Sequence, residues 1–530
     1  MTGRSDSASR KPDGYAWYVA GVLFLIYLFN YVDRSVLNVL SQLVKQELGV
    51  SDSVIGFLVG PAFAVFYALA GIPIARYADR SNRVRIIVAG CVVWSGFTIA
   101  TAYAQSWPEL ALYRMGVGIG EAAFLAPAYS ILADYFPMGY RARALSLFGL
   151  AVYFGQVTGM VSGAMLGASL GWRDVFVYAG IPGIFIAALA LATVREPVRG
   201  AMDRGPAETI ARDRTTSPAL LPVLRDLWAY RSFRNLCIGT ALGVFGGQAF
   251  AGWSAPFLMR LHGADLAAIG KVFAPPYLLS ALVGTLLGGL VADRLFRRDF
   301  DAPLRASSYA LVFATACLCL ACWVSEFGTV VWLTIPMGLV GGGWVLAVQS
   351  STQNALPAEL RATGTAVFWF VVNLFGIAAG PLAAGFLSDL FAARFGDESL
   401  RYGLLASIAV SFVGAAVIWA AARGLRVAPH VKLYLQFGTE DVASYAAQAG
   451  WMTAFESVGA QILRPACGAC ANCGPGSSTA STQVTVSAIN RNFPGRSGPG
   501  SVWLASPATV AASAIRGTLT SFAELRAAFI

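Results

Sequence analysis

Charged residues are scarce in this chain of 530 residues, in which Asp, Glu, Lys and Arg together make up only 12%. Apolar runs of about 20 residues recur instead from Tyr15 to Ala422, and each is long enough to cross a hydrocarbon core about 30 Å thick. A soluble core of this size does not need such long runs. The composition therefore excludes an ordinary soluble protein and predicts a multi-pass membrane protein.

Two patterns that would indicate other functions are also missing. No phosphate-binding loop of the form Gly-x-x-x-x-Gly-Lys-Ser/Thr occurs, which argues against an ATP-driven pump. The glycines of "GVGIGE" (116–121) lie inside an apolar run, so we interpret them as packing glycines and not as a nucleotide-binding loop. The segment "MTGRSDSASRKPDG" has no signal-peptide pattern, and we expect the first span to be a retained anchor.

The net charge of +10 does not indicate a nucleic-acid partner, because the arginines cluster in every second one of the short loops between the predicted spans. Opposite loops such as "KQELGVSD" and "QSWPE" are mixed or acidic. By the positive-inside rule we expect both termini and the Arg-rich loops in the cytoplasm, with the protein in the plasma (inner) membrane. The clustered arginines are Arg76, Arg80, Arg83, Arg85, Arg141, Arg143, Arg294, Arg297 and Arg298.

The apolar runs number twelve, and a polar, proline-containing linker divides them six and six. We predict an all-α membrane protein with twelve transmembrane helices in two pseudo-symmetric six-helix bundles, followed by a small soluble α/β-like tail. The predicted parts are a cytoplasmic N-terminal tail (1–14), an N-terminal bundle (15–194), a cytoplasmic linker (195–232), a C-terminal bundle (233–424) and the soluble tail (425–530). The spans begin near Trp17, Ser53, Val84, Pro108, Arg143, Asp174, Phe233, Leu266, Ala306, Thr329, Ala362 and Tyr402.

The two halves repeat one another in two places. Ala-Asp-Arg ends the second span and again the eighth, each time with a further arginine three residues on. The fifth span carries glycines at 155, 159, 163 and 167, and the eleventh carries glycines at 376, 380 and 385. Such glycines let a neighbouring helix backbone come close. Ordinary helix packing explains either glycine set alone, but their matching positions favour a duplicated six-helix unit.

These features resemble the major facilitator superfamily of secondary transporters. "GIPIARYADRSNRVR" is similar to the signature loop between helices two and three, and "ALYRMGVGIGEA" is similar to the helix-four signature. Within the superfamily, "NYVDRSVLNVL", "WRDVFVYAGIPG" and "FVVNLFGIAAGPLAAGFLSD" most resemble the Spinster-like branch. The resemblance covers about residues 15 to 424 and implies a secondary transporter with alternating access. For the branch it implies an association with sphingolipids and lysolipids.

Four charged residues lie inside apolar runs of the N-terminal half: Asp33 and Arg34 in the first, and Arg114 and Glu121 in the fourth. A charge at the bilayer centre costs about 2.5–3.5 kcal/mol on insertion scales, so we expect these groups to neutralise one another around a wet cavity. Arg114 and Glu121 share a helix face but are too far apart to pair well, and the first span offers partners. One interpretation is a fixed ion-pair network between the two helices.

The other interpretation is a proton relay with Glu121 or Asp33 as the titrating acid. Arg34 and Arg114 would modulate it or contact an anionic group of the substrate. Burial favours the neutral form of a carboxyl group, and a nearby arginine favours the carboxylate. An acid that changes partner between two conformations therefore changes its proton affinity, as coupling to a proton gradient requires. The Spinster-like resemblance implies the same four positions.

The C-terminal half lacks such charges, and its helices carry neutral polar and aromatic groups that we expect to line an amphipathic substrate cavity. These residues are Gln248, Trp253, Tyr277, Gln349, Gln353, Trp369 and Asn373. They could equally form hydrogen bonds between helices. Lys271 lies near a helix end, where we expect its side chain to snorkel towards the membrane surface.

The repeated loop motif predicts a cytoplasmic gate. Its residues are Asp79, Arg80, Arg83, Asp293 and Arg294. A carboxylate near the first turn of a helix is stabilised by the helix dipole, so an aspartate of one half could lock onto a helix of the other half. The alternative is that these arginines only anchor the loops on the cytoplasmic side.

The tail from residue 425 resembles the end of the iron–sulfur domain region of the aconitase and isopropylmalate dehydratase large subunits. "SAINRNFPGR" and "LASPATVAASAI" carry the resemblance. It implies that Cys467 and Cys470 match two cluster ligands, and that Asn490, Arg491 and Arg496 match residues that handle substrate carboxylates. A cluster needs a third thiolate from upstream, and the nearest upstream cysteine, Cys322, lies in a predicted span. We therefore expect vestigial ligands, no cofactor and no enzyme activity. Zinc on Cys467, Cys470 and Cys473 is the alternative.

Taken together, the sequence predicts a monomeric secondary active transporter that is coupled to protons and moves a small amphipathic or lipid-like solute. Two alternatives are a proton-coupled carrier of drugs or organic anions, and a membrane-anchored hydro-lyase or sensor that uses the tail. Coupling to sodium is open as well, because a carboxylate can bind that ion.

Overall fold

The computed structural model describes residues 12–78, 80–199, 202, 220–296, 301–356, 361–422, 427–448, 451–465, 474–489, 495–522 and 524–525. Within these residues, 11 helical stretches are long and apolar enough to cross a membrane. The last stretch, Thr363–Ala421, has 59 residues and turns back on itself at Gly396, where φ is +55°. Counted as two crossings, it brings the described chain to the predicted twelve.

The first bundle is built from eight helical segments that form six crossings. They are α1 (Gly14–Leu48), α2 (Asp52–Val59), α3 (Pro61–Ala78), α4 (Arg83–Thr101), α5 (Trp107–Ala122), α6 (Leu125–Tyr135), α7 (Met138–Leu170) and α8 (Trp172–Thr193). Local sequence sets where they begin. Asp13 accepts a hydrogen bond from the Ala16 amide at 2.8 Å, and Asn82 accepts one from the Arg85 amide at 2.8 Å. Such side-chain caps satisfy amides that a helix start leaves unpaired.

The second bundle repeats this plan. It contains α10 (Arg231–His262), α11 (Leu266–Ala268), the π-helical turn η1 (Ile269–Phe273), α12 (Ala274–Phe296), α13 (Ala302–Trp323), α14 (Phe327–Gly341), α15 (Trp344–Ala355), α16 (Arg361–Val371), the π-helical segment η3 (Val372–Ala378), α17 (Ala379–Phe395), the short 3₁₀ turn η4 (Gly396–Glu398) and α18 (Ser399–Ala421). A further helix, α9 (Leu220–Ala229), lies within the range predicted as a polar linker.

Corresponding glycines make the same contact in both bundles. A methyl group added at Gly159 would lie 2.7 Å from the Val32 carbonyl oxygen of α1, and one added at Gly380 would lie 2.3 Å from the Phe245 carbonyl oxygen of α10. The fifth crossing therefore packs on the first in one half, and the eleventh packs on the seventh in the other. The fourth and tenth crossings are both interrupted midway, between α5 and α6 and between α14 and α15. These matches confirm the predicted pair of pseudo-symmetric bundles.

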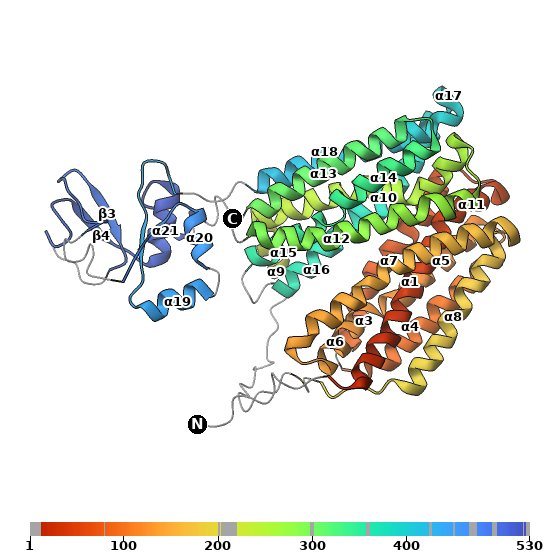
Figure 1. Ribbon diagram of the computed structural model, residues 1–530, viewed down its shortest axis with the longest axis horizontal. Coiled ribbons are helices and arrows are strands. Elements are labelled where there is room, and N and C mark those ends of the chain that lie inside the picture. The colour runs from red at the N-terminus through yellow and green to blue at the C-terminus, as the bar shows by residue number, and fades with distance from the viewer. Residues whose placement is uncertain are drawn as a thin grey trace.

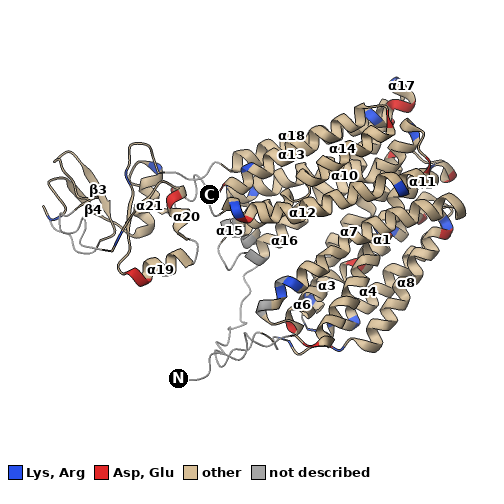
Figure 2. Cartoon of the chain, in the orientation of Figure 1, with Lys and Arg blue, Asp and Glu red and all other residues tan. Residues whose placement is uncertain are grey.

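The two bundles meet at one end and diverge towards the other (Figure 1). We call the end where α1 begins and α8 ends the linker end, and the end where α2 begins and α17 ends the far end. Contacts between the bundles join α2 to α17, α1 to α10, and α7 to α12 and η1. Acidic and basic residues gather near the helix ends, and most of each helix between them is uncharged (Figure 2).

The tail is a small α/β unit, as predicted. Strands β1 (Tyr434–Gln436) and β2 (Gln461–Leu463) pair in parallel, as do β3 (Val484–Ser487) and β4 (Ser501–Leu504). The helices are α19 (Glu440–Gln448), α20 (Trp451–Ser457) and α21 (Pro507–Arg516). Ser506 caps α21 by accepting a hydrogen bond from the Thr509 amide at 3.1 Å.

Candidate functional site

An ion pair between α1 and α5 lies inside the first bundle. Nη2 of Arg34 lies 2.5 Å from Oε2 of Glu121, and Nε of Arg34 donates to the same oxygen at 2.7 Å. The side chain of Glu121 is 0% exposed, whereas that of Arg34 is 25% exposed. Arg34 is therefore the member of the pair that another molecule can reach.

Aromatic rings surround the guanidinium group of Arg34. Its Cζ atom lies 4.4 Å from the ring centroid of Phe63, 4.9 Å from that of Tyr31 and 5.1 Å from that of Tyr67. The face of an aromatic ring attracts a cation, and the attraction is stronger away from water. The positive charge of Arg34 therefore keeps favourable neighbours even when the carboxyl group of Glu121 is neutral.

Asp33 and Arg114 flank this pair and are almost completely buried. Oδ2 of Asp33 accepts a hydrogen bond from Thr98 at 3.1 Å, while its Oδ1 atom has no hydrogen-bond partner among the described residues. Within the described parts of the chain, Glu121 Oε1 and Arg114 Nε also lack hydrogen-bond partners. Buried polar atoms without partners are rare in proteins, and they mark places for ordered water or a transferable proton.

Glu121 stands at the last turn of α5, next to the interruption of the fourth crossing. Between α5 and α6 the backbone hydrogen bonds span three residues instead of the four of an α-helix. The Ala123 amide donates to the Gly120 carbonyl, and the Phe124 amide donates to the Glu121 carbonyl. Pro127, near the start of α6, has no amide hydrogen to offer the preceding turn. The sequence thus places an acid beside a joint in the middle of a membrane helix.

Arg83 lies at the linker end of the same bundle, where it binds two carboxylates. Its Nη1 atom lies 2.5 Å from Asp134 Oδ2 on α6, and its Nε atom lies 2.6 Å from Glu196 Oε1 after α8. Nη1 also donates to Ser130 at 2.7 Å. Arg83 is buried and links three segments of one bundle, so its contacts hold that bundle together at this end.

The other predicted gate residues have different surroundings. Arg80, Asp293 and Arg294 are exposed, and no ion pair or hydrogen bond joins their side chains to another residue in the described parts of the chain. Asp79 and Arg297 lie outside the described residues. The structure therefore brings Arg83 to acidic partners and leaves Arg80, Asp293 and Arg294 facing outwards.

The predicted cavity residues of the second bundle divide into two kinds. Trp253 is fully buried and donates from Nε1 to the Pro381 carbonyl at 2.8 Å, which places it in the packing between α10 and α17. The others are half-buried, namely Gln248, Tyr277, Gln349, Gln353, Trp369 and Asn373. Gln353 donates to Thr365 at 3.2 Å, and Asn373 donates to the Trp369 carbonyl at 2.7 Å. Lys271 is exposed.

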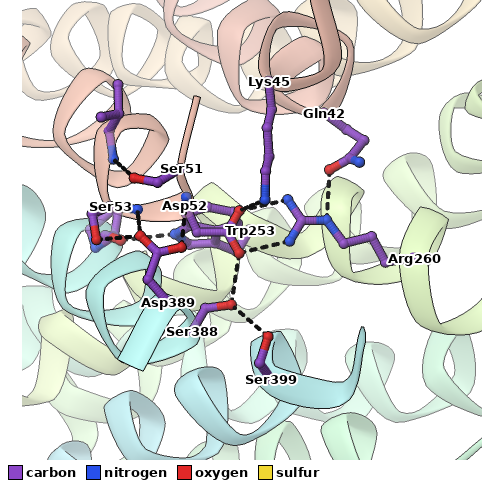
Figure 3. A network of polar contacts seen from close by, with 12 residues as sticks. Gln42, Lys45, Ser51, Asp52, Ser53, Trp253, Arg260, Ser388, Asp389 and Ser399 are labelled. Atoms are coloured by element: carbon purple, nitrogen blue, oxygen red, sulfur yellow. Dashed lines mark hydrogen bonds and ion pairs between the residues drawn. The ribbon is translucent and has the colours of Figure 1, made fainter. Parts of the chain in front are cut away.

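A second polar network, which the sequence did not suggest, joins the two bundles at the far end (Figure 3). Both terminal nitrogens of Arg260 on α10 bind Asp52 at the start of α2, each at 2.8 Å. Asp52 also accepts a hydrogen bond from Lys45 at 2.5 Å and one from Ser388 on α17 at 2.7 Å. Its carboxylate, which is 4% exposed, is thus surrounded by donors from both halves of the chain.

Asp389 on α17 completes this network. Its carboxylate accepts hydrogen bonds from the backbone amide of Asp52 at 3.0 Å and from that of Ser53 at 2.7 Å, and the Ser53 hydroxyl donates to it at 2.5 Å. Gln42 on α1 accepts a hydrogen bond from Nε of Arg260 at 2.7 Å. The signal available in the sequence was a basic residue near the end of the seventh span and an acidic one near the end of the eleventh.

The predicted metal ligands of the tail, Cys467 and Cys470, lie outside the described residues, as do Cys473, Asn490 and Arg491. Upstream, Cys322 is fully buried within α13, so it cannot supply a third thiolate to a cluster in the tail. No group of three or more metal-binding side chains occurs among the described residues.

Two pseudo-symmetric helix bundles, with charged groups at mid-depth and a polar contact closing one end, define a transmembrane transporter. The family model of the Major Facilitator Superfamily matches residues 23–381, and the chain belongs to this superfamily. A model of the aconitase family (aconitate hydratase) matches residues 407–517. The transporter fold and the likeness of the tail to aconitases both follow the predictions from sequence.

Individual relatives support this assignment. The chain is 32% identical over 435 residues to an MFS-type efflux pump of Mycolicibacterium smegmatis, a match that covers 80% of this chain and 96% of the relative. It is 26% identical to a sphingosine-1-phosphate transporter of Xenopus tropicalis over 73% of this chain and 77% of that protein.

Among solved structures, a bacterial homologue of the human lysosomal transporter Spinster, in an inward-facing and unoccupied conformation, matches with a TM-score of 0.70. The sequence identity is 28%, and the match covers 78% of this chain and 98% of the homologue. This confirms the resemblance to the Spinster-like branch.

Proposed function

We propose that the protein is a secondary active transporter that couples a proton gradient to the movement of a small amphipathic or lipid-like solute. The observation that supports this most is the pair formed by Arg34 and Glu121, a buried acid at mid-depth whose basic partner is partly exposed. A charge pair with no functional role would be costly to keep at this depth.

The geometry suggests how the coupling proceeds. Glu121 takes up a proton when water reaches its unpaired Oε1 atom, and the neutral carboxyl group then binds Arg34 less strongly. Arg34 stays charged among its aromatic neighbours and becomes available to an anionic group of the solute. When the bundles rock to the other state, Arg34 returns to Glu121, and the proton leaves on the opposite side. Asp33, with its unpaired Oδ1 atom, offers a second place for the proton.

The orientation in the membrane is argued from the positions of the charged residues. The linker end carries the Arg-rich loops, so we propose that it faces the cytoplasm and that the protein lies in the plasma (inner) membrane as a monomer. The similarity to an inward-facing homologue agrees with a state that opens towards this end.

The class of solute is argued from the second bundle and from relatives. Its half-buried residues Gln248, Tyr277 and Trp369 are neutral, which suits a solute with a long apolar part. Likeness to a sphingosine-1-phosphate transporter points the same way. The second candidate is proton-coupled export or import of drugs or organic anions, and the 32% sequence identity to an efflux pump favours export.

The test is transport by the purified protein in proteoliposomes with an imposed pH gradient. Lysophospholipids and sphingoid lipids are offered first, followed by drugs and carboxylates. We expect uptake that depends on the gradient, and we expect Glu121→Gln to abolish the pH dependence. Sodium replaces the pH gradient in a parallel series.

The matched control is Glu109→Gln, which removes an exposed carboxylate from the first turn of the same helix. This variant should keep both the transport rate and the pH dependence. Proton coupling through this site would be refuted by unchanged coupling in both Glu121→Gln and Asp33→Asn.

For the tail, we propose that it holds no iron–sulfur cluster and has no hydro-lyase activity, because a third thiolate is not within reach. Protein reconstituted anaerobically with iron and sulfide should show no visible cluster absorbance and should not hydrate aconitate. Deleting the residues after 424 should leave transport unchanged. Loss of transport in that variant would instead favour a sensing role for the tail.

A further inference from the structure

The carboxylate of Asp52 lies where two side chains of the second bundle and one of the first converge. Arg260 and Ser388 belong to the second bundle, whereas Lys45 belongs to the first. The bond between Arg260 and Asp52 uses two parallel N–H groups, a geometry that combines strength with a fixed orientation. The carboxylate is buried, so solvent does not weaken these contacts as it weakens a surface ion pair.

The start of α2 is capped by the opposite bundle. A helix leaves its first amides without partners inside the helix. Here Ser51 accepts a hydrogen bond from Val54, while Asp389 accepts those of Asp52 and Ser53. A negative charge at this position is also favoured by the helix dipole. The first turn of α2 is therefore complete only when α17 lies against it.

Glycines let the two backbones touch at this point. A methyl group added at Gly385 of α17 would lie 2.2 Å from the Asp52 carbonyl oxygen, and one added at Gly56 of α2 would lie 2.5 Å from the Pro381 carbonyl oxygen. Neither position has space for a side chain while the far end is closed. The polar network and the close packing therefore depend on the same approach of α2 to α17.

Several groups keep a neighbour from their own bundle if α2 and α17 separate. Asp52 keeps Lys45, and Arg260 keeps the ring of Trp253, whose centroid lies 5.8 Å from its Cζ atom. Ser388 keeps Ser399 on α18 at 3.3 Å. Separation thus removes the contacts between bundles without leaving Asp52 or Arg260 alone.

We propose that Asp52, Arg260 and Asp389 form a far-end latch, which holds this end closed while the linker end is open and which must release in every transport cycle. The proposal rests on the alternating-access transport proposed above. It assigns a positioning role to three residues that lie apart from the pair formed by Arg34 and Glu121.

The test is hydrogen–deuterium exchange of the full chain in lipid nanodiscs, read on the peptide that contains the start of α2. Arg260→Gln removes the two-pronged bond but touches neither the Asp52 amide nor the Ser53 amide. We expect the exchange of these amides to become at least about 100-fold faster, which is the lower end of the effect of breaking a buried ion pair. Gly385→Ala should act in the same direction by forcing α17 away.

The matched control is Glu47→Gln. Glu47 also lies at the far end, but it binds Arg173 and Trp172 of its own bundle. This variant should leave the exchange of the α2 amides unchanged. Peptides of α13, which contains none of the substituted residues, should exchange at the same rate in all variants if the bundles stay folded.

The latch is refuted if the α2 amides exchange at the wild-type rate in Arg260→Gln, or if Glu47→Gln accelerates them equally. The measurement needs no solute, so its failure is distinguishable from a failure to transport. If the protein transports but Arg260→Gln leaves the exchange of the α2 amides unchanged, only the latch is refuted. If Arg260→Gln accelerates that exchange but the wild-type protein shows no proton-driven uptake, only the proposed coupling is refuted.

Discussion

The two bundles share one plan of helices but differ in what they place at mid-depth. In the first, α1 and α5 bring Arg34, Glu121 and their charged neighbours together in the interior. In the second, half-buried residues such as Gln248 and Asn373 are polar but uncharged. Helix packing is therefore common to both halves, while the buried ion pair between Arg34 and Glu121 belongs to the first half.

This difference suggests a division of work. In the proposed mechanism the first bundle binds and releases the proton, and the second bundle lines the solute cavity. Both would move together, because the far-end latch ties Asp52 of one half to Arg260 of the other. The comparison makes separable predictions, since a change in one bundle should alter a property that the matched change in the other leaves intact.

The largest effect is expected at Arg34. Replacing Arg34 with Gln leaves Glu121 buried without its cation, so the acid should stay protonated and proton-driven accumulation should be lost. Gln248→Leu in the second bundle should instead change the solute concentration that gives half-maximal uptake, with the pH dependence unchanged. Uptake measured against solute concentration at several pH values distinguishes the two. Loss of pH dependence in Gln248→Leu would contradict the division of work.

The next effect concerns stability at the linker end. Arg83 binds Asp134 and Glu196 in the interior of the first bundle, and breaking such a buried pair costs about 3–5 kcal/mol. Arg83→Gln should therefore unfold at a clearly lower temperature in detergent. Arg294→Gln, at an exposed position of the second bundle, should change the free energy of unfolding by about 0.5 kcal/mol or less. An equal loss of stability in both variants would show that Arg294 is held at the linker end of the second bundle as strongly as Arg83 is in the first.

The smallest effect should be the same in both bundles. Gly159→Ala and Gly380→Ala each push a methyl group against a carbonyl oxygen of the neighbouring helix, and such overpacking costs about 1–3 kcal/mol. Thermal unfolding should shift by similar amounts in the two variants. Gly149→Ala, which meets open space, serves as the control. A large effect in one bundle alone would break the symmetry inferred from packing.

Much of the fold could be predicted because a membrane imposes a strict pattern on sequence. Length and hydropathy located the spans to within a few residues: the second was expected near Ser53 and begins at Asp52, and the eighth begins at Leu266 as expected. The repeated glycines predicted a duplicated unit, because close packing of helices leaves few alternatives. Helix α9 was missed, since it lies in a range that reads as polar linker.

The interior charges could be predicted for the same reason: Arg34 and Glu121 stand out against apolar neighbours. The far-end network could not be. Asp52 lies at a helix start and Asp389 near a helix end, where a charged residue is unremarkable in any membrane protein. Only the three-dimensional arrangement shows that residues 208 positions apart, Asp52 and Arg260, face each other. The aromatic neighbours of Arg34 were missed because Phe63 lies on another crossing.

The joint between α5 and α6 places a turn without full helical bonding directly after Glu121. On its other side α6 carries Asp134, which is fastened to Arg83. A tilt of α5 that accompanies a change of partner at Glu121 can thus be absorbed within the fourth crossing itself. Arg83 at the start of α4 keeps its bonds to Asp134 and Glu196 while α5 tilts, so the linker end of the first bundle does not have to rearrange.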